Sequence, residues 1–329
     1  MRGVKRRGHL KNNNILGIII FESNYAENLS YFWAGGKTLM LSDNEKRILN
    51  KHLQEVGIKG DLKSIFAVGG GCINNCYAIQ FHTDEKVFLK VNNKETKDNF
   101  EKEKFNLNYL KGKSSLRVPE VIALFEISHK VYLLLEYLER TIENDAFFLA
   151  YGKGLAELHK NTTSFFGWYH DNYIGSLVQQ NNQCTTWSEF YITQRLDPLV
   201  KECYDKKMLD KTSIRSFQNL YNRLEDIYPN DPPALLHGDL WQGNRMPVKE
   251  GAAVFDAACY YGHREMDIAM NLLFGHLPSS FYDAYNSVYP LEKNFMQRKD
   301  ISQLYPLLVH AVLFGMSYIY DIKSIIKKF

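Results

Sequence analysis

The residues best suited to chemistry lie in one short stretch, residues 237–244, which reads HGDLWQGN. A second carboxylate follows where the apolar run 252–255 leads into Asp256. Phosphoryl transfer needs an aspartate that orients the attacking hydroxyl and accepts its proton, and it needs amide and carboxylate oxygens that hold Mg²⁺ against the phosphates. Asp239 is the candidate for the first task, and Asn244 and Asp256 are the candidates for the second. The alternative is an ordinary turn, because Gly, Asp and Asn are common turn formers.

The spacing within this stretch favours the catalytic interpretation. Asp239 and Asn244 stand as far apart as the Asp and Asn of the H-R-D-x-x-x-x-N loop of protein kinases. Gly238 takes the place of the arginine, and that variant belongs to small-molecule kinases of the aminoglycoside-phosphotransferase type. His237 and Asp267 are candidates for support of this loop, and Asp267 could cap the apolar helix that it opens, brace the loop, or do both.

A glycine-rich turn lies between two predicted strands, residues 64–68 and 76–81. Backbone N–H groups of such a turn can approach phosphate oxygens closely. The evidence is weak by itself, because hairpins commonly use Gly and Asn and the turn lacks the G-x-G-x-x-G form. The residues predicted to cover the phosphates are Gly69, Gly70, Gly71, Cys72, Ile73 and Asn74.

Lys90 lies inside the apolar strand 87–91, where a lysine is costly unless it is paired. We interpret it as the lysine that contacts the α- and β-phosphates of ATP and pairs with a helix glutamate. The alternative is a solvent-facing lysine on an edge strand. The following helix, with Phe100, Phe105, Leu107 and Leu110 on its expected apolar face, offers Glu101 and Glu103 as partners.

The next buried strand, residues 131–138, ends in a polar break. We interpret Glu136, Tyr137 and Leu138 as the hinge whose backbone hydrogen-bonds adenine, although a plain core strand would have the same residue types. Later segments predict a helix at 147–159, an aromatic and polar loop at 166–176, a helix at 187–196 and a helical remainder from 279 onward.

Composition limits the class of protein. With 329 residues and 45% apolar content, the chain can build one large two-lobed domain or two smaller ones. A net charge of +3 is too small to favour nucleic acid as a partner. Five scattered cysteines, an odd number, favour reduced thiols and a cytoplasmic location. The apolar run 15–21 is far shorter than the about 20 residues that span a bilayer, so no membrane partner is expected.

Residues 1–39 fit poorly with the rest of the chain and are interpreted as an N-terminal appendage of uncertain status. Their apolar run resembles part of a signal peptide, but no small-residue cleavage site follows it. Helix signals begin at residues 42–45, so Met40 is an alternative start.

Several stretches together resemble the fructosamine-3-kinase (ketosamine-3-kinase) family. The most specific is HGDLWQGN at 237–244, since Trp241 is more particular to that family than the general HGD motif. The others are GGGCIN at 69–74, DNYIGS at 171–176, WSEFYITQRL at 187–196 and FDAACYYGHREMDIAM at 255–270. The resemblance covers about residues 41–329. Ala257 departs from it, because the family usually has proline there.

The resemblance implies an α+β, protein-kinase-like fold with two lobes. The smaller lobe, expected at 40–139, would carry an antiparallel sheet and a helix; the larger, expected at 140–329, would be mostly helical. It implies transfer of the ATP γ-phosphate, with Mg²⁺, to the sugar 3-hydroxyl of ketosamines. Fructosamine or ribulosamine adducts of small amines or protein lysines would be the partners, and their phosphorylation promotes deglycation and so protein repair.

The resemblance also selects Glu103 as the partner of Lys90 and implies a substrate pocket. The predicted pocket residues are Asp171, Asn172, Tyr173, Trp187, Arg195, Trp241 and His263. Trp241 could stack on a sugar face or pack between the loop and the core, and Arg195 could serve only structure. Cys72, in the phosphate-covering turn, is a candidate redox-sensitive thiol, and the protein is expected to be a monomer or a homodimer.

Three other functions stay open at this stage. One is a kinase for aminoglycosides, choline or another small alcohol. Another is a nucleotide-binding pseudokinase, although Lys90, Asp239 and Asp256 are all present. The third is a protein kinase acting on Ser or Thr, against which the HGD form and the lack of a recognisable A-P-E segment weigh.

Overall fold

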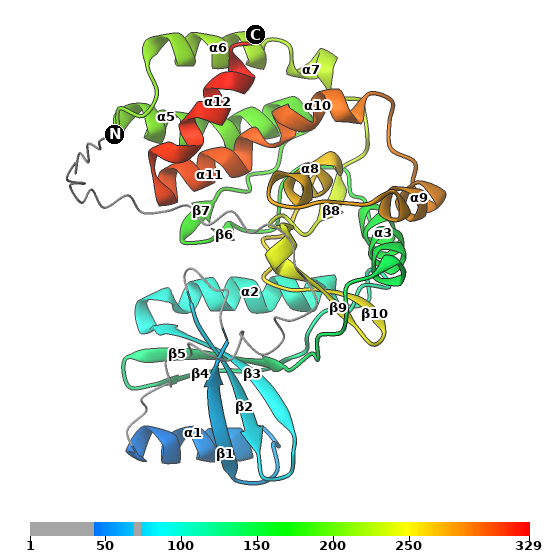
Figure 1. The fold of residues 1–329 in the computed structure, drawn as a ribbon. Coiled ribbons are helices and arrows are strands. Elements are labelled where there is room, and N and C mark those ends of the chain that lie inside the picture. Colours follow the sequence, from blue (N-terminus) through cyan, green and yellow to red (C-terminus); the bar gives the residue numbers. More distant parts are fainter. Residues whose placement is uncertain (1–42, 69–73) are drawn as a thin grey trace, which may run out of the picture. The chain divides into compact units, whose positions relative to one another are not determined.

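The structure of the protein is a computed structural model that describes residues 43–68 and 74–329 (Figure 1). The appendage predicted at 1–39 and the turn residues Gly69, Gly70, Gly71, Cys72 and Ile73 lie outside the described residues. The redox prediction for Cys72 therefore stays a prediction.

The smaller lobe is built on an antiparallel five-stranded sheet in the order β1-β2-β3-β5-β4. Its strands are β1 (Leu62–Ala67), β2 (Asn75–Phe81), β3 (Lys86–Asn93), β4 (Val121–Ile127) and β5 (Lys130–Glu136). The strands predicted at 64–68, 76–81, 87–91 and 131–138 are confirmed within a few residues at their ends. Lys90 lies on β3, which is paired on both sides, so the edge-strand alternative is wrong.

Both faces of this sheet are covered, which explains why β5 has no alternating polar pattern. Leu133 and Leu135 belong to the apolar core that continues into the larger lobe. Tyr132 and Leu134 face the other way and belong to a second core. Helix α1 (Asp43–Glu55) closes that second core with buried Leu49 and Leu53, so the described part of the smaller lobe contains this helix in addition to the predicted one.

Helix α2 (Lys97–Leu110) packs on β4 and β5 from the side of the larger lobe. Its buried residues Phe100, Leu107 and Leu110 recur at helical spacing and join the same core as Leu133. Phe105, predicted on this apolar face, is instead 38% exposed. Helix α2 therefore lies between the sheet and the segments of the larger lobe that carry the predicted site.

The larger lobe is mostly helical, as predicted. Its helices are α3 (Asp145–His159), α4 (Trp187–Phe190), α5 (Asp197–Asp205), α6 (Lys211–Tyr221), α7 (Leu224–Ile227), α8 (Glu265–Leu273), α9 (Ser279–Val288), α10 (Phe295–Ser302), α11 (Leu304–Phe314) and α12 (Ile319–Ile326). The single helix predicted at 187–196 is α4 followed by a π-helical turn, η3 (Tyr191–Leu196). Among the described residues, no helix is both long enough and apolar enough to cross a bilayer.

Short two-stranded sheets carry the segments around the predicted site. β8 (Ala234–Leu236) pairs with β11 (Tyr260–Gly262), β9 (Arg245–Val248) with β10 (Gly251–Val254), and β6 (Asn172–Ile174) with β7 (Leu177–Gln179). β8 ends immediately before His237 and β9 begins immediately after Asn244. Both ends of the stretch 237–244 are thus held by strand pairing.

Candidate active site

Asp239 and Asn244 are joined within the loop 237–244. Asn244 closes the 3₁₀ turn η4 (Gln242–Asn244) and is buried. Its Nδ2 donates to the main-chain oxygen of Asp239 at 2.8 Å and to the Asp239 Oδ2 at 3.1 Å. The Oδ1 atom of Asn244 accepts no hydrogen bond within the described residues. One amide therefore orients the Asp239 carboxylate and still offers an oxygen as a ligand.

Asp256 stands two residues beyond β10 with a positive φ of 62°. A non-glycine residue in this region is strained and persists only where its surroundings hold it. The Phe255 N–H donates to the Asn244 carbonyl at 3.1 Å, and the His237 Nε2 lies 3.0 Å from the Phe255 carbonyl. The Ala258 N–H donates to the His237 carbonyl at 2.9 Å. The Asp256 turn is thus tied on both sides to the loop that carries Asp239.

Lys90 brings the smaller lobe to this turn. Its Nζ lies 2.8 Å from both carboxylate oxygens of Glu103 and also contacts Oδ1 of Asp256. Of the two predicted partners, the structure pairs Lys90 with Glu103, while Glu101 forms an ion pair with Lys97 at 3.6 Å. The Lys90 side chain is almost fully buried, so its charge needs these carboxylates.

The charges of the cluster affect one another. Burial lowers the pKa of Lys90, but Asp256 and Glu103 outweigh burial and raise it, so Lys90 stays a cation. Burial favours protonation of Asp256, yet Lys90 holds the pKa of Asp256 below its usual value. Burial, then the negative charge of Asp256, raise the pKa of Asp239 well above its usual value. Asp239, the one carboxylate in the sequence 237–244, is therefore disposed to take up a proton.

His237 serves the loop as a neutral ring. Burial lowers its pKa, and its contacts require one tautomer. Nε2 faces the Phe255 carbonyl, which only accepts, so Nε2 carries the proton. Nδ1 then accepts the N–H of Asp239 at 3.3 Å. Protonation at Nδ1 would remove that second contact.

Asp267 braces the loop from helix α8, and it makes no side-chain cap at the start of that helix. Its Oδ2 accepts the N–H of His237 at 2.7 Å, and its Oδ1 accepts the N–H of Gly238 at 3.0 Å. His159, at the end of α3, approaches the same Oδ2 at 3.3 Å and the Tyr285 hydroxyl at 2.8 Å. A fully buried carboxylate thus receives the two backbone N–H groups that begin the loop.

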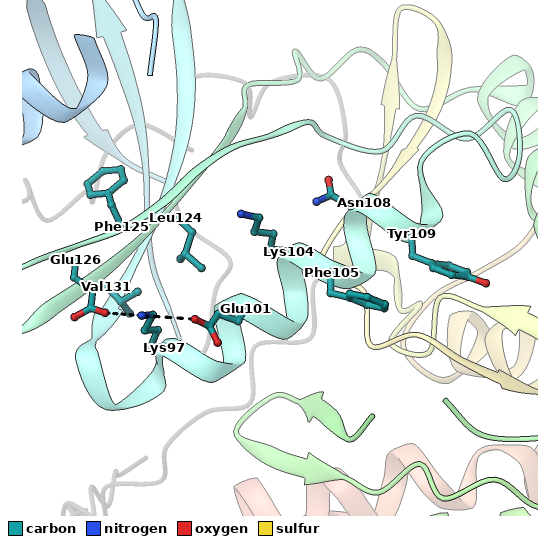
Figure 2. A pocket seen from close by; sticks show the side chains of 10 residues that line it. All are labelled: Lys97, Glu101, Lys104, Phe105, Asn108, Tyr109, Leu124, Phe125, Glu126 and Val131. Atoms are coloured by element: carbon teal, nitrogen blue, oxygen red, sulfur yellow. Dashed lines mark ion pairs between the residues drawn. The ribbon is translucent and has the colours of Figure 1, made fainter. Parts of the chain in front are cut away.

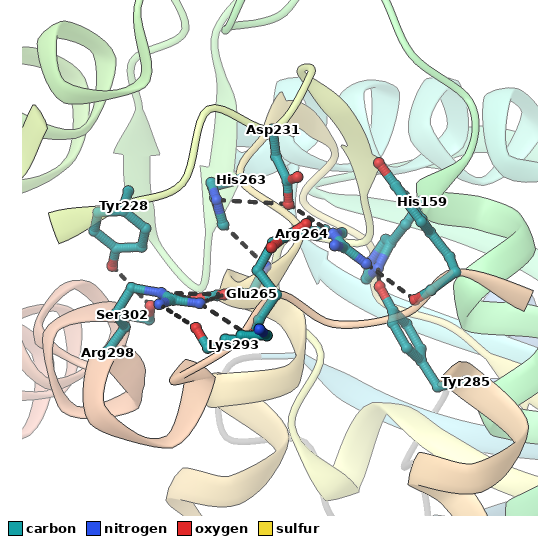
Figure 3. Close-up of polar contacts among 12 residues, drawn as sticks. His159, Tyr228, Asp231, His263, Arg264, Glu265, Tyr285, Lys293, Arg298 and Ser302 are labelled. Atoms are coloured by element: carbon teal, nitrogen blue, oxygen red, sulfur yellow. Dashed lines mark hydrogen bonds and ion pairs between the residues drawn. The ribbon is translucent and has the colours of Figure 1, made fainter. Parts of the chain in front are cut away.

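A buried polar network continues behind this brace (Figure 3). Asp231, which precedes β8, accepts from Arg264 Nε at 2.7 Å and lies 3.8 Å from His263 Nε2. Glu265 accepts from Arg298 Nε at 2.9 Å. The segment leading into α8, and with it Asp267, is therefore held by paired charges from two distant parts of the chain.

Gly238 must be glycine for two separate reasons. Its φ is +85°, and a Cβ atom there would overlap the carbonyl oxygen of Ala258. We expect Gly238→Ala to lower the free energy of unfolding by about 3 kcal/mol, combining left-handed strain with overpacking. Gly112→Ala is the matched control, because Gly112 also has a positive φ, +77°, but open space around it, and should cost only about 1 kcal/mol. Equal losses in urea unfolding would contradict the overlap.

The donor set fits Mg²⁺. Carboxylate and amide oxygens are the hard ligands this ion prefers, and it usually binds through one or two carboxylates plus substrate phosphates. Asn244 precedes β9 and Asp256 follows β10, and Arg245 pairs with Val254 in that hairpin. The two candidate ligands are therefore carried by one hairpin, facing Lys90.

The predicted nucleotide residues are placed as follows. Asn74 lies at the start of the β2–β3 pair, where its Oδ1 accepts from Asn92 at 2.7 Å. Glu136 ends β5, and its side chain turns to Arg117 and to the N–H of Glu120. Tyr137 and Leu138 follow, half-buried, and within the described residues the N–H of Leu138 has no hydrogen-bond acceptor.

Four of the predicted pocket residues are buried in the interior. Asn172 donates to the Cys259 carbonyl at 2.8 Å and accepts from both Gln179 and Asn181. Arg195 lies over the Tyr260 ring at 4.0 Å and donates to Asn181 Oδ1 at 2.7 Å. Trp187 and His263 are core residues, 6% and 0% exposed. Direct substrate contact by these four does not agree with the structure, because protein atoms already surround their polar groups or rings.

The other three predicted pocket residues are more accessible. Asp171 is exposed, although its Oδ1 accepts the N–H of Asn181 at 2.8 Å. The Tyr173 hydroxyl donates to Asp98 on α2 at 2.8 Å. Trp241 is half-buried, packs against the main core and covers Gly243 of its own loop. Its position corresponds to the packing alternative rather than to a free stacking surface.

A groove of about 850 Å³ lies away from these residues, between α2 and the strands β4 and β5 (Figure 2). Phe105, Leu124 and Phe125 contribute apolar walls, and Lys97 reaches both Glu126 and Glu101 at its rim. None of Lys90, Asp239, Asn244 and Asp256 lines it.

The sequence assigned no role to His159, Asn106 or Asp231, which contact Asp267, Ala257 and Arg264, respectively. A signal existed for His159, a histidine at the end of an amphipathic helix. No signal existed for Asp231, because its partners Arg264 and His263 lie far along the chain.

Buried neutral histidines should make the protein sensitive to acid. Burial lowers the pKa of His263 to about 3, against about 6.5 in the unfolded chain. Below pH 6.5 the unfolded chain therefore binds a proton that the folded chain does not, and stability falls as the pH falls. At pH 5.5 this costs about 1.4 kcal/mol. Between pH 7.5 and 5.5, the free energy of unfolding should therefore fall by about 1.4 kcal/mol less in His263→Gln than in wild type, as measured by urea unfolding. An equal fall in both proteins would contradict this.

Comparison with known proteins agrees with this geometry. The fructosamine kinase family profile matches residues 45–329. The chain is 37% identical over 279 residues to a "Probable ketoamine kinase" of Enterococcus faecium, covering 83% of this chain and 98% of that one. It is 35% identical over 275 residues to the chloroplastic protein-ribulosamine 3-kinase of Arabidopsis thaliana, covering 80% and 82%.

Solved structures give the same result for the fold. The crystal structure of a candidate fructosamine-3-kinase from Haemophilus somnus superposes with a TM-score of 0.76 at 29% identity, covering 85% of this chain and 96% of that one. An aminoglycoside phosphotransferase superposes with a TM-score of 0.57 at 16% identity, covering 86% and 98%, and so shares the fold alone. The chain belongs to the fructosamine kinase family, and it is an ATP-dependent phosphotransferase with that family's two-lobed, kinase-like α+β fold.

Proposed function

We propose that this protein transfers the γ-phosphate of ATP to the sugar 3-hydroxyl of ketosamines. The acceptors are fructosamine or ribulosamine adducts of small amines or of protein lysines. The phosphorylated adduct decomposes and frees the amine, so the reaction promotes deglycation. The observation that carries the proposal is the convergence of Lys90, Glu103 and Asp256 beside the joined pair of Asp239 and Asn244.

Each group has one task in this mechanism. Asp239 aligns the sugar hydroxyl and accepts its proton late, because the transition state of phosphoryl transfer is loose. Its raised pKa supports the role of proton acceptor. Lys90, held by Glu103, positions the α- and β-phosphates. Asn244 and Asp256 would hold Mg²⁺, and the bound ion would neutralise charge on the phosphates.

The remaining residues position the nucleotide and the lobes. The backbone at 136–138 binds adenine, with the free N–H of Leu138 as donor, and the turn 69–74 covers the phosphates. The smaller lobe extends from about 40 to 139 and the larger lobe from 140 to 329. Asp171, Tyr173 and Trp241 stay candidates for the acceptor side, while Asn172, Trp187, Arg195 and His263 support the pocket from behind.

We also propose a cytoplasmic location. Cys76, Cys184, Cys203 and Cys259 are all free thiols, as a reducing compartment requires. Burial raises the pKa of Cys76 and of Cys203 to about 11, so these thiols are weakly reactive.

The deciding experiment is ATP turnover with Mg²⁺ on a panel of acceptors. The panel contains ribulosyl-lysine, fructosyl-lysine, kanamycin, choline and a sample without acceptor. We expect turnover on a ketosamine that disappears in Asp239→Ala, followed by release of free lysine. Turnover only on kanamycin or choline would discard the substrate assignment, and ATP binding without turnover on any acceptor would favour a pseudokinase.

A further inference from the structure

Helix α2 presents two polar side chains to the turn that carries Asp256. Glu103 and Asn106 are three residues apart, so they lie on the same face of the helix. Glu103 holds Lys90, and Asn106 donates from Nδ2 to the carbonyl oxygen of Ala257 at 2.9 Å. One helix face thus contacts both the candidate phosphate-binding lysine and the residue next to the candidate metal ligand.

Asn106 is an unfavourable residue for its place by every local criterion. It is 1% exposed, and its Oδ1 has no hydrogen-bond partner among the described residues. Asparagine is a poor helix former, and a buried amide oxygen without a donor costs free energy. A leucine would suit both the helix and the surrounding core better. What asparagine provides at this position, and leucine could not, is the hydrogen bond to the carbonyl oxygen of Ala257.

That bond reaches a turn which needs support. Asp256 has a positive φ, and its other backbone ties, through Phe255, Ala258 and His237, all come from the larger lobe. The Asn106 bond comes from the smaller lobe, from the helix that also holds Lys90. It therefore links the position of Asp256 to that of Lys90 by a route independent of their direct contact.

We infer that Asn106 is a positioning residue that sets the orientation in which Asp256 binds the metal of the metal–nucleotide complex. The inference rests on the proposed function only in assigning that metal to Asp256. When the Asn106 bond is lost, the Asp256 turn is held from one lobe alone and samples other orientations. Metal affinity should then fall, while the site for the sugar acceptor is unaffected.

The test is metal binding in Asn106→Leu. We expect the affinity for Mn²⁺, measured by electron paramagnetic resonance with a non-hydrolysable ATP analogue present, to fall about 10-fold, as is usual when a residue supporting a metal ligand is removed. In Asn106→Leu, the KM for Mg²⁺ should rise in parallel, and the KM for a ketosamine should stay constant. Asn106→Gln keeps the N–H donor, so its affinity for Mn²⁺ should lie between those of Asn106→Leu and wild type. If the leucine variant does not fold, Asn106→Ala also removes the hydrogen bond to Ala257, and its Mn²⁺ affinity should fall in the same way.

Leu110→Ala is the matched control. It loosens the same helix at a buried residue but leaves the Asn106 bond in place, so it should lower Tm and keep the Mn²⁺ affinity. An Asn106→Leu variant with unchanged Mn²⁺ affinity, whatever its Tm, would overturn the inference, as would equal weakening of Mn²⁺ binding in Leu110→Ala. If wild type binds no Mn²⁺ with the nucleotide, the metal assignment and the inference both fall. If it binds Mn²⁺ but phosphorylates no ketosamine, only the proposed acceptor is wrong.

Discussion

Replacing Asp239 with alanine should lower kcat at least about 10²-fold, which corresponds to about 2.7 kcal/mol of lost transition-state stabilisation. The carboxylate is held by the Asn244 amide at 3.1 Å, and its raised pKa suits it to accept the proton of the sugar hydroxyl. No other carboxylate of the loop can take its place. Because Asp239 is assigned to the acceptor and not to ATP, the KM for ATP should change little. Steady-state kinetics with saturating ketosamine would measure both constants.

A matched carboxylate separates this effect from a general loss of charge. Glu250 is exposed in the turn between β9 and β10, in the hairpin that carries the candidate metal ligands. Glu250→Gln should keep wild-type kcat. Near-normal turnover in Asp239→Ala would remove Asp239 from the mechanism, and an equal loss in both variants would mean that the assay reports stability.

Lys90→Met should reduce both activity and stability. Without Lys90, kcat/KM for ATP should fall about 10²-fold, because no other cation of this cluster faces the phosphates. The buried Glu103 would also lose its partner, and breaking a buried pair costs about 3–5 kcal/mol. Asp256, whose side chain is 43% exposed, is partly screened by water, so we expect about 3 kcal/mol. The loss of stability should be smaller at pH 5, because protonation neutralises the buried carboxylate that Lys90 no longer pairs with.

Two further variants distinguish these effects. Lys90→Met/Glu103→Gln removes the unpaired buried charge, so it should recover much of the stability in urea unfolding but none of the activity. Lys86→Met, on the same strand, removes the exposed pair with Glu139 at 2.9 Å and the contact of Lys86 with the Tyr137 ring, and it should change stability far less than Lys90→Met. If the double variant is no more stable than Lys90→Met, the pairing of Lys90 with Glu103 does not explain the loss.

The candidate catalytic pair in the loop could be predicted because it is local. Asp239 and Asn244 belong to one loop whose spacing alone brings an amide against a carboxylate. The glutamate that pairs with Lys90 was a different case. Glu101 and Glu103 have the same chemistry on the same helix, and family resemblance, not any property of the helix sequence, selected Glu103. The structure separates them because α2 turns position 103 toward β3 and position 101 toward Lys97.

The substrate side was the least predictable from residue types. Asn172, Arg195 and His263 are polar residues in motif-like stretches, and polar residues are more often exposed than buried. The structure places them inside, because carbonyl oxygens, amides and aromatic rings from distant segments surround them. These residues are therefore candidates for support of a substrate pocket rather than for contact with the substrate.

By itself, the sequence predicted the strands and helices around the site from apolar periodicity, and it made Asp239, Asn244 and Asp256 candidates for phosphoryl transfer from short-range spacing. Its resemblance to a known family implied the α+β class. Only the tertiary structure decided that Lys90 meets Asp256 from the other lobe, that Asp267 holds the start of the loop, and that Asn106 reaches Ala257. These contacts join residues far apart in the chain, and burial and hydrogen bonding depend on neighbours that folding brings together.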